Sequence, residues 1–175
     1  MKRAAAIVCW GIFVLTAAAD QPVPPPKDHT VKSSNGRFAA VITVRPPQTT
    51  AYAISGFRRQ KLWSMPGYQR LAYLADDGQH LVVGYVGANL IPTNYTRDLV
   101  MLSFFHQGKL IREVPLREII PDLSKLERTV SHFYWGMFTG FAKDGFFYLE
   151  TVDQRRLKYN ACTGRLRATA RIKTR

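Results

Sequence analysis

The sequence predicts a mostly all-β protein whose strands follow one another as an antiparallel meander. Two observations lead to this fold class. From Val31 onward, apolar and polar residues alternate with period two over most of the chain, which is the pattern of half-buried strands. Short turns that contain Gly, Asn or Asp separate these runs, as they do in hairpins.

The strand that starts at Phe38 shows the alternation clearly. Phe38, Ala40 and Ile42 fall on one face, and Pro46-Pro47 ends the run because proline cannot donate to a sheet ladder. Further on, Asp76-Asp77-Gly78 is a hairpin signal of the Asp-Gly type. The remaining strands are expected at 52–54, 61–65, 69–74, 80–86, 99–105, 110–114, 146–152, 156–159 and 166–172.

One segment, between Pro115 and Val130, predicts one or two short helical turns near 116–130. Its apolar residues recur at helical spacing, namely Leu116, Ile119, Ile120, Leu123 and Leu126. Pro121 lies inside this run and disfavours the helical conformation of the residue before it. We therefore expect the second turn to start with Asp122 as its N-cap.

Three predicted units contain a similar turn before an apolar run. These turns read Ser34-Asn35-Gly36-Arg37-Phe38, Asp76-Asp77-Gly78-Gln79-His80-Leu81 and Lys143-Asp144-Gly145-Phe146-Phe147, and a second turn recurs as Gln107-Gly108-Lys109-Leu110 and Thr163-Gly164-Arg165-Leu166. The pattern resembles the blade repeats of β-propellers. A closed propeller has about four to eight blades, and this pattern gives only three. The resemblance thus implies a truncated propeller, and an antiparallel sandwich-like domain is the arrangement that we favour beside it.

Residues 1–19 are expected to be a cleaved secretion signal. Met1-Lys2-Arg3 is a positive start, residues 4–19 are uncharged, and Ala17-Ala18-Ala19 is an A-x-A cleavage site. An uncleaved anchor is the alternative. This leader indicates an exported protein, either periplasmic or secreted. The leader itself is of a bacterial type. Residues 20–30 contain four prolines and are expected to be an extended spacer, followed by a single β-rich domain at residues 31–175.

The chain is strongly basic, with a formal net charge of +13. Such a surplus favours a polyanionic partner. Because export argues against nucleic acid, the expected partners are anionic lipid, lipopolysaccharide or acidic polysaccharide. A protein partner and self-association are further alternatives.

The sequence contains no G-x-S-x-G elbow, P-loop or dinucleotide-binding motif. Its histidines are never spaced i, i+4, so we expect neither a metal site nor a cofactor. His132 and Glu150 are weak candidates for a general acid–base pair if their strands meet, and they would support the alternative function, hydrolysis of a cell-envelope polymer. We expect Glu150 to pair with a neighbouring Lys or Arg instead.

Two other features have both a structural and a functional interpretation. Cys162, the only cysteine outside the leader, is expected to be a small, partly buried turn residue, and a reactive thiol is the alternative. The aromatic stretch 131–138 is expected in the core, and a surface that stacks on sugars is the alternative.

The end of the chain provides the candidate binding site. Cations recur at alternate positions, namely Arg165, Arg167, Arg171, Lys173 and Arg175, and alternate residues of a strand share one face. Edge strands also carry Lys or Arg to prevent aggregation. We predict a non-catalytic exported domain that binds an anionic envelope component through this face, reversibly and in a salt-sensitive way, at about 1 kcal/mol per cation.

Overall fold

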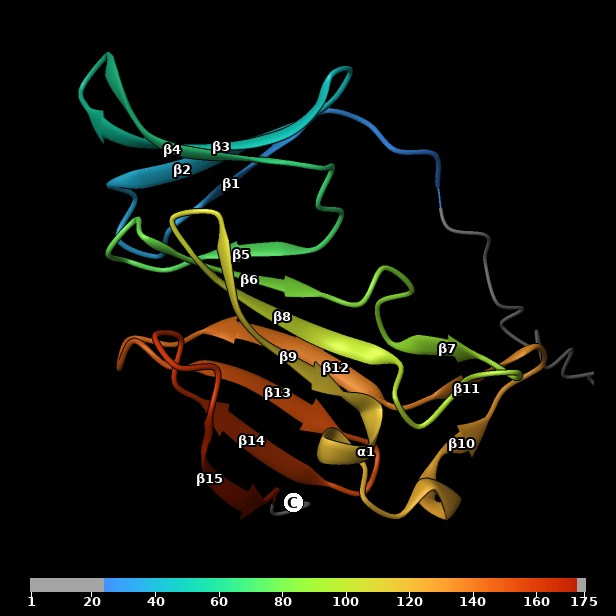
Figure 1. Ribbon diagram of the computed structural model, residues 1–175. Helices are drawn as coiled ribbons and strands as arrows, with labels where there is room; N and C mark the ends of the chain where they lie inside the picture. The colour runs from blue at the N-terminus through green and yellow to red at the C-terminus, as the bar shows by residue number, and fades with distance from the viewer. Residues whose placement is uncertain (1–23, 173–175) are drawn as a thin grey trace, which may run out of the picture.

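The computed structural model describes residues 24–172, which form a mostly β structure of antiparallel sheets. Three four-stranded sheets lie one above another in chain order, and a small three-stranded sheet lies beside them (Figure 1). This confirms the predicted all-β class. Each large sheet is an up-and-down meander, as in the truncated-propeller alternative. The predicted signal 1–19, residues 20–23 of the spacer, Lys173 and Arg175 lie outside the described residues.

The first sheet has the order β1-β2-β3-β4. Its strands are β1 (His29–Lys32), β2 (Phe38–Val44), β3 (Pro47–Ser55) and β4 (Arg58–Pro66). β1 begins two residues before the predicted start of the domain at Val31, because His29 and Thr30 already pair with Ile42 and Val41. The predicted spacer is therefore wrong at its last two residues.

The second and third sheets repeat this plan. The second consists of β5 (Ala72–Leu74), β6 (His80–Gly84), β8 (Val100–His106) and β9 (Lys109–Pro115). The third consists of β12 (Gly136–Phe141), β13 (Phe147–Thr151), β14 (Arg155–Tyr159) and β15 (Leu166–Arg171). The small sheet is formed by β10 (Glu127–Arg128), β11 (His132–Tyr134) and β7 (Leu90–Pro92).

The helical segment follows the prediction. α1 (Leu116–Ile119) is a single turn with Leu116 and Ile119 buried, and the 3-10 turn η1 (Leu123–Lys125) follows Pro121. Asp122 caps η1, since its side chain accepts hydrogen bonds from the backbone N–H and the hydroxyl of Ser124. Among residues 24–172 there is no helix with the length and apolar character needed to cross a membrane.

The turn between the first and second strands is the same in all three large sheets. Its glycine has a left-handed backbone conformation, with φ of +70° at Gly36, +67° at Gly78 and +76° at Gly145. The residue before the glycine accepts a backbone hydrogen bond from two positions further on: Asn35 from Arg37, Asp77 from Gln79 and Asp144 from Phe146. The predicted repeat is therefore a repeat of structure.

Two hydrophobic clusters lie between consecutive sheets. The cluster between the first and second sheets contains several small residues, such as Ala40, Ala51 and Ala72. The cluster between the second and third sheets contains large ones, among them Phe104, Phe147 and Tyr159. Trp135 of the aromatic stretch is fully buried in this second cluster, and its indole N–H donates to the Ala88 carbonyl at 2.7 Å, so the core interpretation holds for this residue.

Candidate functional site

β15, which carries the predicted cations, is the outer edge strand of the third sheet, and all six of its residues are exposed. Arg165 lies just before the strand, and Arg167 and Arg171 lie within it. The structure thus places the described part of the predicted cationic strand in contact with solvent. Lys173 and Arg175 are not among the described residues.

The register between β14 and β15 shows which cations share a face. Arg171 lies opposite Arg155, and Ala170 lies opposite Arg156. Since directly opposite residues project from the same face of a sheet, Arg155 continues the face of Arg171 while Arg156 belongs to the other face. The cations of β14 are therefore divided between the two faces of the sheet.

Each cation of β14 has a carboxylate partner. Arg155 Nε lies 2.7 Å from Asp153, Lys158 Nζ lies 2.9 Å from Asp144, and Arg156 pairs with Glu150. By contrast, no carboxylate within residues 24–172 forms an ion pair with the arginines of the basic edge, a name that we use for Arg165, Arg167 and Arg171. The charge of the basic edge is therefore not neutralised by the described part of the fold.

Asp144 illustrates how the third sheet fixes its charges. The carboxylate accepts a hydrogen bond from the Tyr148 hydroxyl at 2.7 Å and pairs with Lys158. These two partners, in that order, lower the pKa of Asp144 to about 2 because they stabilise its ionised form. The same contacts raise the pKa of Lys158, whose Nζ also lies 3.9 Å from the centre of the Phe146 ring.

His132 and Glu150 are on strands that do not pair with each other. β11, which carries His132, pairs with β7 and β10, whereas β13, which carries Glu150, pairs with β12 and β14. The Glu150 carboxylate accepts hydrogen bonds from Arg156, one of them from Nε at 3.0 Å. Glu150 thus has the basic partner that we expected for a structural role.

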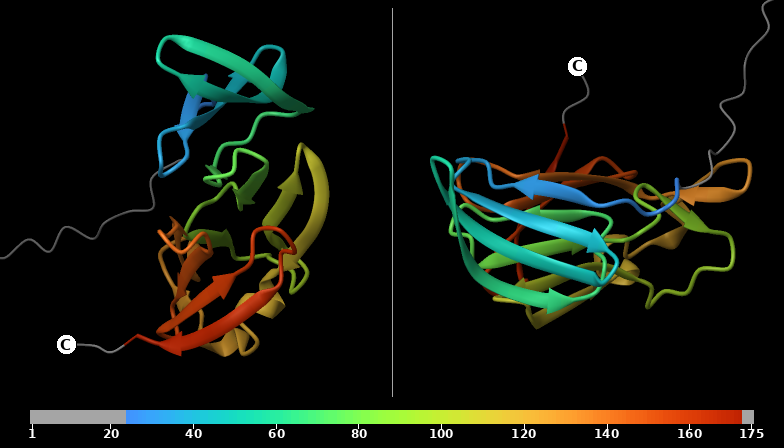
Figure 2. Two further views of the ribbon diagram at one scale, coloured as in Figure 1. Left: turned by 90° about the vertical axis from the view of Figure 1, so that its left-hand side faces the viewer. Right: turned by 90° about the horizontal axis from the view of Figure 1, so that it is seen from above.

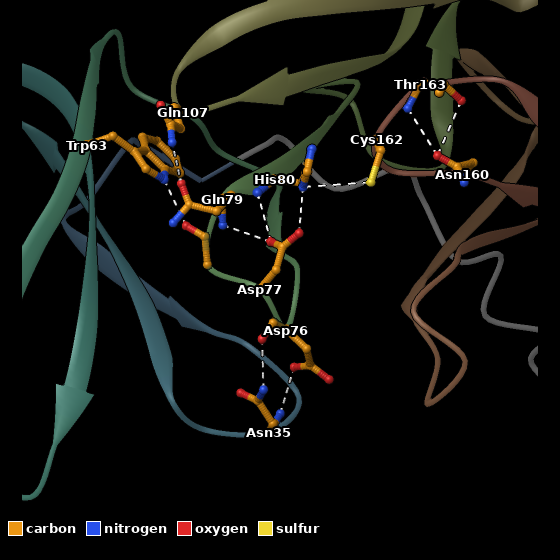
Figure 3. A network of polar contacts seen from close by, with 11 residues as sticks. Asn35, Trp63, Asp76, Asp77, Gln79, His80, Gln107, Asn160, Cys162 and Thr163 are labelled. Carbon is orange, nitrogen blue, oxygen red and sulfur yellow. Dashed lines mark hydrogen bonds and ion pairs between the residues drawn. The ribbon is translucent and has the colours of Figure 1, made fainter.

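A network of polar contacts joins turns of all three sheets (Figure 3). Asn35 of the first sheet donates from its backbone N–H to the Asp76 carboxylate at 2.8 Å and from its side-chain amide to the Asp76 carbonyl at 2.9 Å. Within the second sheet, Gln107 donates to Gln79 at 2.7 Å. These contacts fasten the repeated turns to one another.

The same network contains a group of residues that the sequence analysis did not bring together. Cys162 is exposed, so our expectation of a partly buried residue was wrong; its Sγ lies 4.0 Å from His80 Nδ1. Asp77 Oδ2 lies 2.6 Å from that same nitrogen, and the His80 ring stacks on His106 with 4.8 Å between centroids. Cys162 and His80 are 82 positions apart, and no local motif links them.

What this group can do chemically depends on His80 Nδ1, the nitrogen that both Asp77 and Cys162 approach. Burial alone would raise the pKa of Asp77, but hydrogen bonds from the His80 side chain and from the backbone of Gln79 and His80 outweigh it and lower that pKa. In a catalytic triad, the nucleophile and the carboxylate use opposite nitrogens of the imidazole. Here both meet Nδ1, as Figure 3 shows, so the contacts do not form such a relay.

A hollow lies between the first strands of the three large sheets. Val31 and Lys32 of β1, Tyr73 of β5 and Gly140 of β12 are among its lining residues. Burial raises the pKa of Tyr73. The lining contains neither a carboxylate nor a histidine, and across residues 24–172 no group of three or more His, Cys, Asp or Glu is placed to hold a metal ion. The lining of this hollow therefore offers no pair of a histidine with a carboxylate.

Comparisons with known proteins give likenesses of structure. No family model matches the chain, and no curated protein matches it. Among solved structures, it is similar to a periplasmic gluconolactonase of Pseudomonas aeruginosa, with 21% identity, a TM-score of 0.40, and 82% of this chain and 38% of that chain covered. It is also similar to a putative 6-phosphogluconolactonase of Bacteroides fragilis, with 14% identity, a TM-score of 0.39 and the same coverage. The chain spans well under half the length of either.

Proposed function

We propose that this protein is an exported β domain that attaches to a polyanionic component of the cell envelope through the basic edge. The observation that supports this proposal is the contrast between two adjacent strands. Every cation of β14 is paired with a carboxylate of the same sheet, whereas the arginines of the basic edge are exposed and have no such partner among the described residues.

Arginine suits this role because its planar guanidinium binds phosphate or carboxylate groups in a bidentate manner. Three arginines at about 1 kcal/mol each would contribute about 3 kcal/mol near an anionic surface. An attachment of this strength is reversible, and added salt weakens it because solvent-exposed charges are screened. Such binding fits a peripheral component better than a permanently assembled one.

The test compares two triple variants on a heparin column, because heparin is a polyanion. Arg165→Gln, Arg167→Gln and Arg171→Gln together should lower the salt concentration at which the protein elutes. The control combines Arg97→Gln, Lys125→Gln and Arg128→Gln, which are exposed positions away from β15 and remove the same amount of charge. The proposal requires the control to elute close to the unmodified protein.

Equal losses of retention in the two triple variants would show that only net charge matters, and they would contradict a specific role of the basic edge. Unchanged retention of the first variant would contradict it as well.

A further inference from the structure

The stretch of sequence that contains the first sheet has many basic residues and no acidic ones. Between His29 and Ala75 there is no Asp or Glu. The cations of this stretch are Lys32, Arg37, Arg45, Arg58, Arg59, Lys61 and Arg70. The two carboxylates that flank it accept hydrogen bonds from backbone N–H groups, Asp28 from Val44 and Asp76 from Asn35.

Strand register places two of these cations on the outer face of the sheet. One row of directly paired residues reads Val31, Ala40, Ala51 and Trp63, and it packs into the cluster shared with the second sheet. The next row reads Lys32, Ala39, Tyr52 and Lys61. Because adjacent residues of a strand project from opposite faces, this second row points away from the second sheet.

A hollow of about 320 Å³ lies on this outer face. Its lining includes Thr30, Lys32, Ala39, Ile54, Phe57 and Arg59. Ile54 and Arg59 are a directly opposed pair of β3 and β4. The hollow thus combines an apolar floor with two cations, and it falls at the small end of the about 300–1,000 Å³ range of ligand pockets.

Phe57 is the most exposed large apolar residue on the described surface. It occupies the turn between β3 and β4, after Gly56 with φ of +58° and before Arg58 and Arg59. This hairpin projects at the upper left of Figure 1, away from the other two large sheets. A phenyl ring at this position has no partner within the fold to explain it.

We infer that the outer face of the first sheet docks on a bilayer that contains anionic phospholipids. Phe57 enters the interfacial region, where aromatic side chains bury their apolar area, and Lys32 and Arg59 bind a lipid phosphate in the hollow. Charge complementarity supports a lipid surface, because cations surround the apolar tip and no carboxylate opposes them. If these cations served only to keep the edge of the sheet from aggregating, a fully exposed phenyl ring between β3 and β4 would work against them.

The direct test uses the full chain with Phe57→Trp as a reporter and with Trp10→Phe, which removes the indole of the expected leader. The other tryptophans of the described residues, Trp63 and Trp135, are buried, so the new indole reports on the hairpin. Vesicles of phosphatidylcholine mixed with phosphatidylglycerol should shift its emission to the blue, and vesicles of phosphatidylcholine alone should not. The absence of a shift with the anionic vesicles would overturn the inference, as would an equal shift with both.

Co-sedimentation with the same anionic vesicles measures how much Lys32, Arg59 and Phe57 each contribute to binding. Lys32→Gln and Arg59→Gln should each weaken binding about five-fold, because a cation near an anionic membrane contributes about 1 kcal/mol. Phe57→Ser should weaken it about tenfold or more through the lost apolar burial. Arg97→Gln is the matched control, since it removes the same charge from a loop outside the first sheet, and its binding should stay close to that of the unmodified protein.

This inference stands apart from the proposed function because it concerns the opposite end of the molecule. The triple variant of the basic edge, built on Phe57→Trp, should keep the blue shift on anionic vesicles even where heparin retention is lost. If that variant lost the shift, insertion of the hairpin would depend on the basic edge, and the inference of an independent lipid site would be wrong.

Discussion

The first sheet and the inner strands of the third sheet share an up-and-down plan but differ in how their cations are paired. In the third sheet, β14 carries Arg155, Arg156 and Lys158, and each is paired with a carboxylate. The first sheet has no carboxylate between its first and last residue. The comparison teaches that the basic residues of β14 serve the fold, whereas those of the first sheet, like the basic edge on β15, are left for solvent or a partner.

The cores beside these sheets differ as well. Small side chains such as Ala40 and Ala51 belong to the cluster between the first two sheets. On the other side of the second sheet, Phe147 packs edge to face against Tyr73 and Phe104. The third sheet is thus packed through aromatic rings, whereas the first is packed through alanines together with large side chains such as Trp63 and Met65, in an interior with little free space.

The largest expected effect sharpens this difference in packing. Phe147→Ala should lower the free energy of unfolding by about 3–5 kcal/mol, because it removes a fully buried ring and leaves a cavity. Ala51→Val should lower it by about 1–3 kcal/mol through overpacking. Urea unfolding curves provide both values. An Ala51→Val variant as stable as the unmodified protein would show that the first sheet is not closely packed.

A matched pair of arginine substitutions tests the difference in charge. Arg155 donates to Asp153 and to the Ile119 carbonyl, both at 2.7 Å. Arg155→Gln should therefore lower the free energy of unfolding by about 1–3 kcal/mol, since it leaves partly buried acceptors without a donor. Arg59→Gln, at an exposed position with no ion pair in the described structure, should change it by less than about 0.5 kcal/mol. Similar losses of unfolding free energy in the two variants would show that the two arginines do not differ in their contribution to the fold.

The smallest effect concerns acid stability. The folded pKa of Asp144 is about 2, below the ordinary 3.8, so its ionised form stabilises the folded state. This contribution is present in full above about pH 4 and disappears as the pH falls through about 2. Asp144→Asn should melt below the unmodified protein near neutral pH, and the two melting temperatures should converge near pH 2.

The control for this prediction is Glu127→Gln, at an exposed position outside the three large sheets. Its melting temperature relative to the unmodified protein should not change over the same pH range. A constant difference between Asp144→Asn and the unmodified protein would show that the carboxylate contributes nothing specific as an ion.

Local signals in the sequence explain why much of the fold could be predicted. The glycine turns at Gly36, Gly78 and Gly145 depend on a backbone conformation that few other residues adopt, and Asp122 marked the start of η1. β12 was missed because its register shifts between Phe138 and Gly140, and a bulge of this kind breaks the period of two.

A candidate site could likewise be predicted only where its residues lie close together in the sequence. The basic edge was predicted because its arginines alternate within a single strand. The hollow of the first sheet was not, because Lys32 and Arg59 lie on the two outer strands of that sheet and only the pairing of all four strands brings them to one face. The contact between Cys162 and His80 depends on the packing of two turns from different sheets, which no pattern along the chain encodes.

The hairpin of Phe57 and the basic edge lie at opposite ends of the stack, with the second sheet between them (Figures 1 and 2). If both proposals hold, the thickness of the β-stack sets the distance between the two bound partners.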